Sequence, residues 1–209
     1  MLIFIIILMF FSASISAAPA PTDITPPQIV STANSSEQID KTLSNIAHCG
    51  QNEAAQQLAL LIMQDADQQR ATLLCHPLLA QAAADKAKAM AQAGIVNHYI
   101  GGLGANQRLR MLGYNLPAFY SGTIGNQVEA VAGGYSTAEE AWDAFKHSPT
   151  HRSHLLAELP FYQQQIHIGV GFYYKWSSPH VEYWAIYIAR EAAAEDPEVS
   201  CFDIGCILP

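Results

Sequence analysis

The sequence predicts an α+β domain in which helices precede and separate a group of antiparallel strands. Two observations carry this prediction: helical periodicity fills the first two thirds of the folded part, and apolar alternation of period two fills the last third. The elements do not follow regular β-α-β units, which would predict a parallel sheet. With 209 residues, half of them hydrophobic, the chain is long enough for one domain with a substantial core.

The first 17 residues are almost wholly apolar and then turn small, which is typical of a secretory signal peptide. We expect cleavage after Ala17, because cleavage after Ala18 or Ala20 would leave a proline directly behind the scissile bond. The alternative is an uncleaved membrane anchor, which is favoured by the absence of Lys or Arg before the apolar run. Against an anchor, the run is shorter than the ~20 residues that span a bilayer. Residues 18–35, rich in Pro, Thr and Ser, predict a flexible leader.

Helical patterns begin at Ser36. A helical extension is predicted over residues 36–52, and its helix ends at Gly50. Two further helices are predicted, from Glu53 to about residue 63 and from Pro77 to Gly94. The glycine-rich stretch 101–134 contains one helical piece, 106–112, and otherwise indicates either the wall of a groove or a surface loop.

Two more helices are predicted from their starts. The capping box Ser136-Thr137-Ala138-Glu139 begins a helix that turns Trp142 and Phe145 toward the core. Ser148 and Pro149 supply the N-cap and the first-turn proline of the next helix, which ends near Leu159.

The last third predicts a β-hairpin. Residues 166–172 and 181–190 both alternate with period two, and the break at 177–180 separates them. We expect two antiparallel strands here, followed by a C-terminal tail over 191–209.

Four cysteines remain after the signal, an even count that favours two disulfides in an exported protein. Of the three connectivities, the local one pairs Cys49 with Cys75 and Cys201 with Cys206. The first bond would clamp the N-terminal helix to the core, and it would stabilise the fold by on the order of 3 kcal/mol because it restricts the unfolded chain. The second would only tie down the tail. Metal binding by these cysteines is disfavoured, because no Cys-x-x-Cys spacing occurs.

The net charge of −8, without any basic run, excludes one class of partner. Such a chain repels nucleic-acid phosphates and anionic lipid surfaces at long range, so we expect no nucleic-acid partner.

Three polar residues stand out in apolar stretches: His98, Glu129 and His151. A carboxylate is costly to bury unless it is paired or binds an ion. Two histidines and one carboxylate suit a divalent cation such as zinc, and they equally suit proton transfer. His154, at i+3 from His151, and His147 lie nearby in sequence. A purely structural role remains open for each histidine. Several arginines and tyrosines are most simply interpreted as surface or packing residues: Tyr99, Arg108, Arg110, Tyr114 and Arg152.

The order of several motifs resembles the CAP superfamily (cysteine-rich secretory proteins, antigen 5, pathogenesis-related 1; the SCP domain) in its bacterial form. The resemblance covers Glu53 to Arg190, and it is carried by the following segments: residues 79–90, Asn97-His98, Arg110-Met111-Leu112-Gly113-Tyr114, Val128-Glu129, Trp142, Ser148-Pro149-Thr150-His151-Arg152, Ile168-Gly169-Val170-Gly171 and Tyr183-Trp184. It implies a three-layer α-β-α sandwich with an antiparallel central sheet. It also implies a central cleft lined by two histidines and acidic residues.

On this resemblance His98 and His151 match the two cleft histidines, and Glu129 matches the acid of the Gly-Glu-Asn motif. Val128 and Ala130 replace the flanking glycine and asparagine. The family's second acid corresponds to Phe145, which leaves a three-residue site rather than four. Replacement acids near that position are Glu139, Glu140 and Asp143, although Glu139 is predicted to cap its helix.

We expect a monomeric binding protein, secreted or periplasmic, that holds a divalent cation through His98, Glu129 and His151. The resemblance adds an apolar, lipid or glycan ligand, because CAP proteins are largely extracellular, bind divalent metals and in several branches bind lipids. The alternatives are a buried structural network and a hydrolase that uses the same three residues. A serine hydrolase is disfavoured because the Ser148 hydroxyl is expected to cap its helix, whereas a metal-bound water avoids that objection.

Overall fold

A computed structural model describes residues 45–122, 125–197, 200–202 and 205–207. The predicted signal peptide, the leader and the extension up to residue 44 lie outside the described residues. Among the residues described, no helix is both long and apolar enough to cross a membrane.

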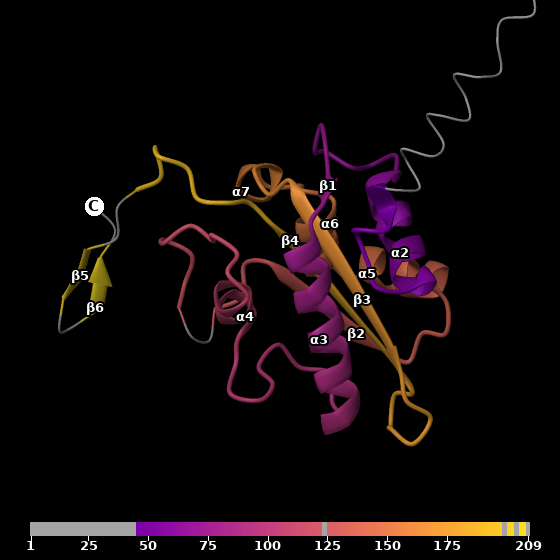
Figure 1. The fold of residues 1–209 in the computed structure, drawn as a ribbon. Helices are drawn as coiled ribbons and strands as arrows, with labels where there is room; N and C mark the ends of the chain where they lie inside the picture. The colour runs from indigo at the N-terminus through magenta and orange to yellow at the C-terminus, as the bar shows by residue number, and fades with distance from the viewer. Residues whose placement is uncertain (1–44, 123–124, 198–199, 203–204, 208–209) are drawn as a thin grey trace, which may run out of the picture.

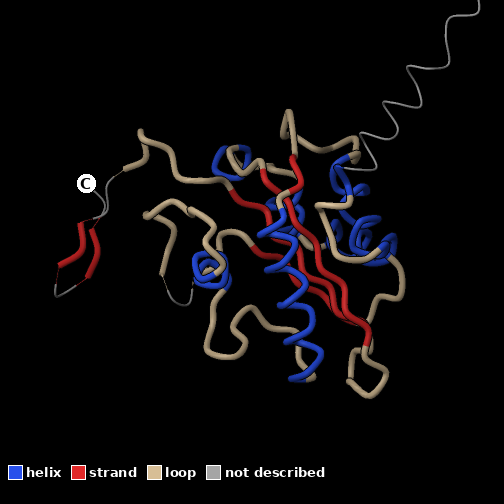
Figure 2. The backbone as a smooth tube through the Cα atoms, viewed as in Figure 1, coloured by secondary structure: helices blue, strands red, loops and turns tan. Residues whose placement is uncertain are grey.

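The domain is an α+β fold built on one four-stranded sheet (Figures 1 and 2). The strand order is β1-β3-β4-β2, and a separate hairpin pairs the last two strands. The strands are β1 Leu74–Cys75, β2 Glu129–Gly133, β3 His167–Tyr174, β4 Glu182–Ala189, β5 Ser200–Phe202 and β6 Gly205–Ile207. The helices are α2 Glu53–Met63, α3 Pro77–Ala93, α4 Ala105–Met111, α5 Ala138–His147, α6 Pro149–Leu155 and α7 Pro160–Gln163.

The sheet buries a separate hydrophobic cluster on each face. On one face α3 and α4 pack against the sheet, and this cluster includes Leu79, Met90, Leu109, Tyr183 and Tyr187. On the other face α2, α5 and α6 pack against it, through Leu58, Trp142, Phe145, Leu155, Trp184 and Ile186. Figure 1 shows α3 across one face of the strands, with α2 and α5 beyond them. The alternation of β4 divides its residues between the two clusters, as a strand buried on both faces requires.

Two glycines of β3 set the distance between the sheet and α3. A Cβ atom built on Gly169 would lie 2.1 Å from the backbone nitrogen of Ala80, and one on Gly171 would lie 2.2 Å from the backbone of Ala83. No side chain fits in this space, so α3 rests directly on the strand. This contact fixes the distance between the sheet and Lys86, which lies on the next turn of α3.

The predicted hairpin is confirmed: β3 and β4 are antiparallel, with Val170 opposite Ile186. The prediction of a wholly antiparallel sheet is wrong, because β1 runs parallel to β3. The two residues of β1 are too few to show any periodicity, and the long connection through α3 to α7 brings β3 back in the same direction. Strand β2 was not predicted, because it lies in the stretch that its glycines marked as irregular.

The helix boundaries require three corrections. The N-cap of α5 is Thr137, whose hydroxyl accepts from the backbone N–H of Glu140, so the capping box lies one residue later than predicted. Helix α6 ends at Leu155 rather than near Leu159, because Ala157 adopts a left-handed backbone (φ 59°). Ser148 is the N-cap of α6, but its hydroxyl makes no capping hydrogen bond, since this residue also ends α5.

The disulfide between Cys49 and Cys75 is present, as predicted. It joins the end of the N-terminal segment to β1, beside the bridge between Gly50 and Val170. The backbone of β5 and β6 places Cys201 opposite Cys206. The predicted bond between these two cysteines concerns side chains that lie outside the described part of the chain.

Candidate functional site

The centre of the site is the buried carboxylate of Glu129, at the first residue of β2. Its side chain is fully shielded from solvent, and it is contacted by polar side chains from three different segments of the chain. His98 Nδ1 lies 2.8 Å from Oε1, and the Tyr187 hydroxyl donates to Oε2. Lys86 Nζ forms an ion pair with Oε1 at 3.5 Å. Of the three residues predicted to form one site, His98 and Glu129 are in contact, and Tyr187 and Lys86 are two partners of the carboxylate that were not predicted.

Lys86 is the cation of this network. Its side chain is fully buried in the middle of α3, and Nζ also donates to the backbone carbonyl of His98 at 2.6 Å. Burial lowers the pKa of Lys86, and the charge of Glu129 opposes that change. Burial, followed by the charge of Glu129, raises the pKa of Tyr187 well above its ordinary value. The hydroxyl thus remains a donor to the carboxylate at all physiological pH values.

The side chain of Asn126 contacts both His98 and Glu129. Its Oδ1 accepts from the backbone N–H of Glu129 at 2.8 Å, and its Nδ2 donates to the backbone carbonyl of Glu129 at 2.9 Å. Nδ2 also lies 3.0 Å from Nδ1 of His98. A carboxylate only accepts hydrogen bonds, so a proton on His98 Nδ1 is assigned to the contact with Glu129, and the Asn126 amide nitrogen, itself a donor, then makes no hydrogen bond to that atom. The lone pair of Nε2 is then left for another partner, on a side chain that is 45% exposed.

His151 is the third residue of α6. Its half-buried ring packs edge-on against Phe145, with the ring centroids 5.2 Å apart. Burial lowers the pKa of His151, and the charge that His98 carries when it is protonated lowers it further. His151 is therefore neutral at pH 7, with a ring nitrogen able to act as a ligand or a base. Phe145, at the position of the expected second acid, supports this ring instead.

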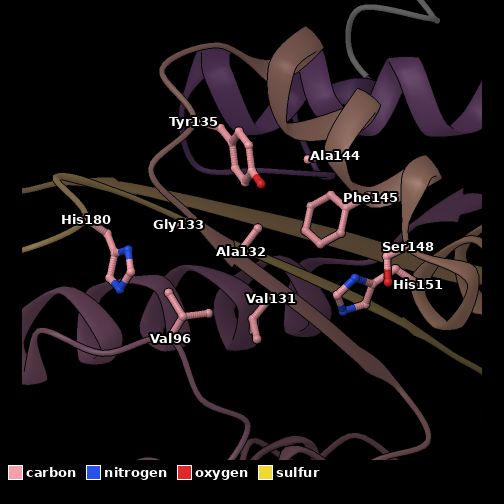
Figure 3. A pocket seen from close by; sticks show the side chains of 10 residues that line it. All are labelled: Val96, Val131, Ala132, Gly133, Tyr135, Ala144, Phe145, Ser148, His151 and His180. Atoms are coloured by element: carbon pink, nitrogen blue, oxygen red, sulfur yellow. The ribbon is translucent and has the colours of Figure 1, made fainter.

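A groove of about 320 Å³ begins at His151 and runs along β2. Figure 3 shows His151 and Ser148 at one end and His180 at the other, with Val131 to Gly133 between them. The lining is mainly apolar and contains no carboxylate; it consists of Val96, Val131, Ala132, Gly133, Tyr135, Ala144, Phe145, Ser148, His151 and His180.

The other histidines named from sequence lie outside the site. His147 is exposed at the end of α5 and bonds the carbonyl of Asp143. His154 is buried against Tyr162, with ring centroids 4.8 Å apart. The possible replacement acids are also elsewhere, since Glu140 caps α5 through Ser136 and Asp143 is exposed.

Three of the residues expected to serve packing or the surface do so. Arg110 donates to the carbonyls of Pro117 and Tyr120, which holds the loop after α4. Arg152 pairs with Glu158, and Tyr114 bonds His167.

The side chains missed by sequence reasoning are Lys86, Asn126, Tyr187 and His180. Lys86 carried a usable signal, because a lysine on the apolar face of a predicted helix needs a buried partner. Asn126 and His180 lie in irregular segments, where no periodicity marks a side chain as inward.

Within the described part of the chain, no three His, Cys, Asp or Glu side chains are grouped closely enough to hold a metal ion. Both oxygens of Glu129 are turned toward the partners named above. Of the three predicted ligands this leaves the imidazoles of His98 and His151, and of these two His151 lines the groove.

Comparison with known proteins gives no assignment. No family model and no curated protein matches the sequence. Among solved structures, the chain is similar to an outer surface protein from Borrelia burgdorferi, with 15% sequence identity and a TM-score of 0.47 over 65% of this chain and 88% of that one. A likeness at this level assigns neither a family nor a function.

Proposed function

We propose that the protein is a CAP-type binding protein of the extracytoplasmic space, which holds a divalent cation through His98 and His151 at the end of the apolar groove. The observation that carries the proposal is the 2.8 Å bond between His98 Nδ1 and Glu129. Histidines that bind metals commonly donate their second ring N–H to a carboxylate, which fixes the ring and raises its basicity. In this arrangement Glu129 orients His98, and water or a bound ligand completes the coordination shell.

Several features support this assignment. His151 is neutral at pH 7, so its lone pair is available without the loss of a proton. The order of the matching residues along the chain is that of the CAP family, which also supplies the proposal of a lipid or glycan ligand. The Cys49–Cys75 disulfide supports an oxidising compartment and hence the signal peptide.

Titration of the purified protein with Zn²⁺ in a calorimeter tests the cation site. We expect the His98→Ala/His151→Ala double variant to lose binding, and Glu129→Gln to bind roughly 10- to 100-fold more weakly, the range typical of outer-shell partners. His147→Ala is the matched control, because this histidine is exposed and close in sequence. Wild-type affinity in the double variant would refute the proposal.

A hydrolase is the second candidate, and one observation favours it. The hydroxyl of Ser148 lines the groove beside His151 and is not used for capping, contrary to the expectation from sequence. However, no hydrogen bond joins Ser148 to His151 among the described residues, so the serine lacks the base that a nucleophile requires. Turnover of a peptide or cell-wall substrate by the wild type, abolished in Ser148→Ala, would establish this alternative.

A further inference from the structure

Strand β2 lies at an open edge of the sheet, next to β4 alone. An edge strand presents unpaired backbone groups on its outer side, and these groups can pair with another extended chain. Whether β2 can do so depends on which of its groups face outward and on whether anything within the described structure covers them.

The pairing register shows which groups face outward. The Val128 carbonyl accepts from the N–H of Ile188 at 2.8 Å, and the N–H of Gly134 donates to the carbonyl of Glu182 at 3.0 Å. In an antiparallel pair, successive residues turn their backbone groups alternately toward and away from the partner strand. Even-numbered residues of this segment therefore face β4. The N–H and C=O groups of Glu129, Val131 and Gly133 face the open edge.

Asn126 covers the first of these three residues. Its side-chain amide accepts from the N–H of Glu129 and donates to its carbonyl, as a neighbouring strand would. Among the described residues, no hydrogen bond reaches the outward groups of Val131 or Gly133. The open edge thus consists of two N–H and two C=O groups, spaced two residues apart.

The groove described above runs along this edge. Successive strand residues point to opposite faces of the sheet. Val131, Ala132 and Gly133 can therefore line one groove together only if the groove runs along the edge of the sheet. Figure 3 shows Phe145 and Ala144 on one side of the strand and Val96 on the other. The two walls come from the two faces of the sheet, as expected for a channel over its edge.

We infer that this groove binds a short extended peptide segment of another protein, which adds as a strand to Val131 and Gly133. The pattern of two donors and two acceptors, two residues apart, matches the outward groups of alternate residues in an extended peptide.

The lining also restricts the chemistry of the peptide. Ala144, Phe145 and Val96 leave space for small apolar side chains, and the residues that pair must not be proline, which lacks the N–H. A Cβ on Gly133 would lie 2.7 Å from Val96 and 3.1 Å from His180, so glycine lets these residues close over the end of the strand. With a histidine at each end and no carboxylate, we expect a neutral segment.

The peptide would occupy the groove that ends at the proposed cation site, but its location follows from the open edge of β2 and not from the cation. The two are distinguishable, because a cation perturbs the imidazole rings of His98 and His151, whereas an added strand perturbs backbone amides of β2.

The test follows the β2 amides by two-dimensional NMR while the full exported chain is titrated with a library of blocked pentapeptides, Ac-Xaa-Ala-Xaa-Ala-Xaa-NH₂, with small neutral Xaa. A binding member should slow hydrogen exchange at Val131 and Gly133, whose N–H groups are open. Ala130 and Ala132 serve as internal controls, because their N–H groups face β4 and should not change. If no member slows exchange at Val131 and Gly133, or if all four amides respond equally, strand addition is wrong.

Two substitutions sharpen the result. N-methylation of a peptide residue that faces β2 should weaken binding about fivefold or more, the equivalent of a lost hydrogen bond, whereas methylation of its neighbour should not. On the protein, Val131→Pro removes one outward donor without touching the ladder to β4, and Val131→Ala keeps that donor as the control. Equal effects of methylation at both peptide positions would overturn the proposal even if Val131→Pro fails to fold.

Discussion

Substitution of His154 should remove a large part of the acid sensitivity of this fold. His154 is buried on α6, and its Nε2 has no hydrogen-bond partner among the described residues. Burial lowers its pKa from 6.5 to about 3, and the charge of Arg70 contributes in the same direction. The folded protein therefore holds this imidazole in its neutral form.

The sign and size of the effect follow from linkage. The unfolded chain protonates His154 near pH 6.5, while the folded protein does so only near pH 3, so acid favours the unfolded state between these values. Stability is complete above pH 6.5 and falls as the pH drops. At about 1.36 kcal/mol for each pH unit, the loss reaches about 3 kcal/mol at pH 4.5 and about 4 kcal/mol at pH 3, where half of the folded molecules are protonated at His154.

Urea unfolding followed by circular dichroism at pH 7 and pH 4.5 measures this loss. His154→Leu lowers stability at pH 7 by an amount that depends on packing, but the additional loss at pH 4.5 should be about 3 kcal/mol smaller than in the wild type. His147→Leu, at an exposed histidine, is the matched control for the replacement of an imidazole by leucine. An identical acid dependence in His154→Leu and the wild type would refute a neutral buried His154.

Three further changes test the framework around the site. Glu129→Gln leaves the Lys86 ammonium buried without its counter-charge, and it should lower the free energy of unfolding in urea by about 3–5 kcal/mol. Lys86→Met in the same chain should recover part of this lost stability. Strictly additive losses of stability would contradict a coupled pair. Arg70→Met removes the donor to four carbonyls of the α6–β3 region, and it should lower the free energy of unfolding by about 3 kcal/mol or more in the same assay. A loss below about 1 kcal/mol would exclude a role of Arg70 in holding this region together. Reduction of Cys49–Cys75, with a sequence separation of 26, should cost about 3.5 kcal/mol, and the Cys49→Ala/Cys75→Ala variant should not respond to the reductant at this bond.

The sequence predicted those parts of the fold that repeat with a clear period. Helices α2 and α3 and the hairpin of β3 and β4 bury one stripe or one alternating set each, so their residue types carry the pattern. Strands β1 and β2 could not be found in this way. β1 has only two residues, and β2 follows a glycine-rich loop and is held in place by Asn126 and by pairing with β4.

Of the candidate site, the sequence predicted that the carboxylate of Glu129 needs a pair or an ion, and the structure gives it His98 as one partner. It did not predict that Tyr187 and Lys86 complete the shell of this carboxylate. The alternation of β4 and the apolar face of α3 assign these two residues to the core equally well without a polar role. Their function depends on long-range contacts across the sheet, which local periodicity does not contain.

The amide of Asn126 also bears on the behaviour of the protein at high concentration. By occupying the outward groups of Glu129, it ends the free side of the sheet after two residues. A continuous open edge is a template for self-association into extended sheets, and a short one is a poor template. Replacement of Asn126 by a residue without an amide would lengthen that template and expose the molecule to aggregation, even where its stability is unchanged.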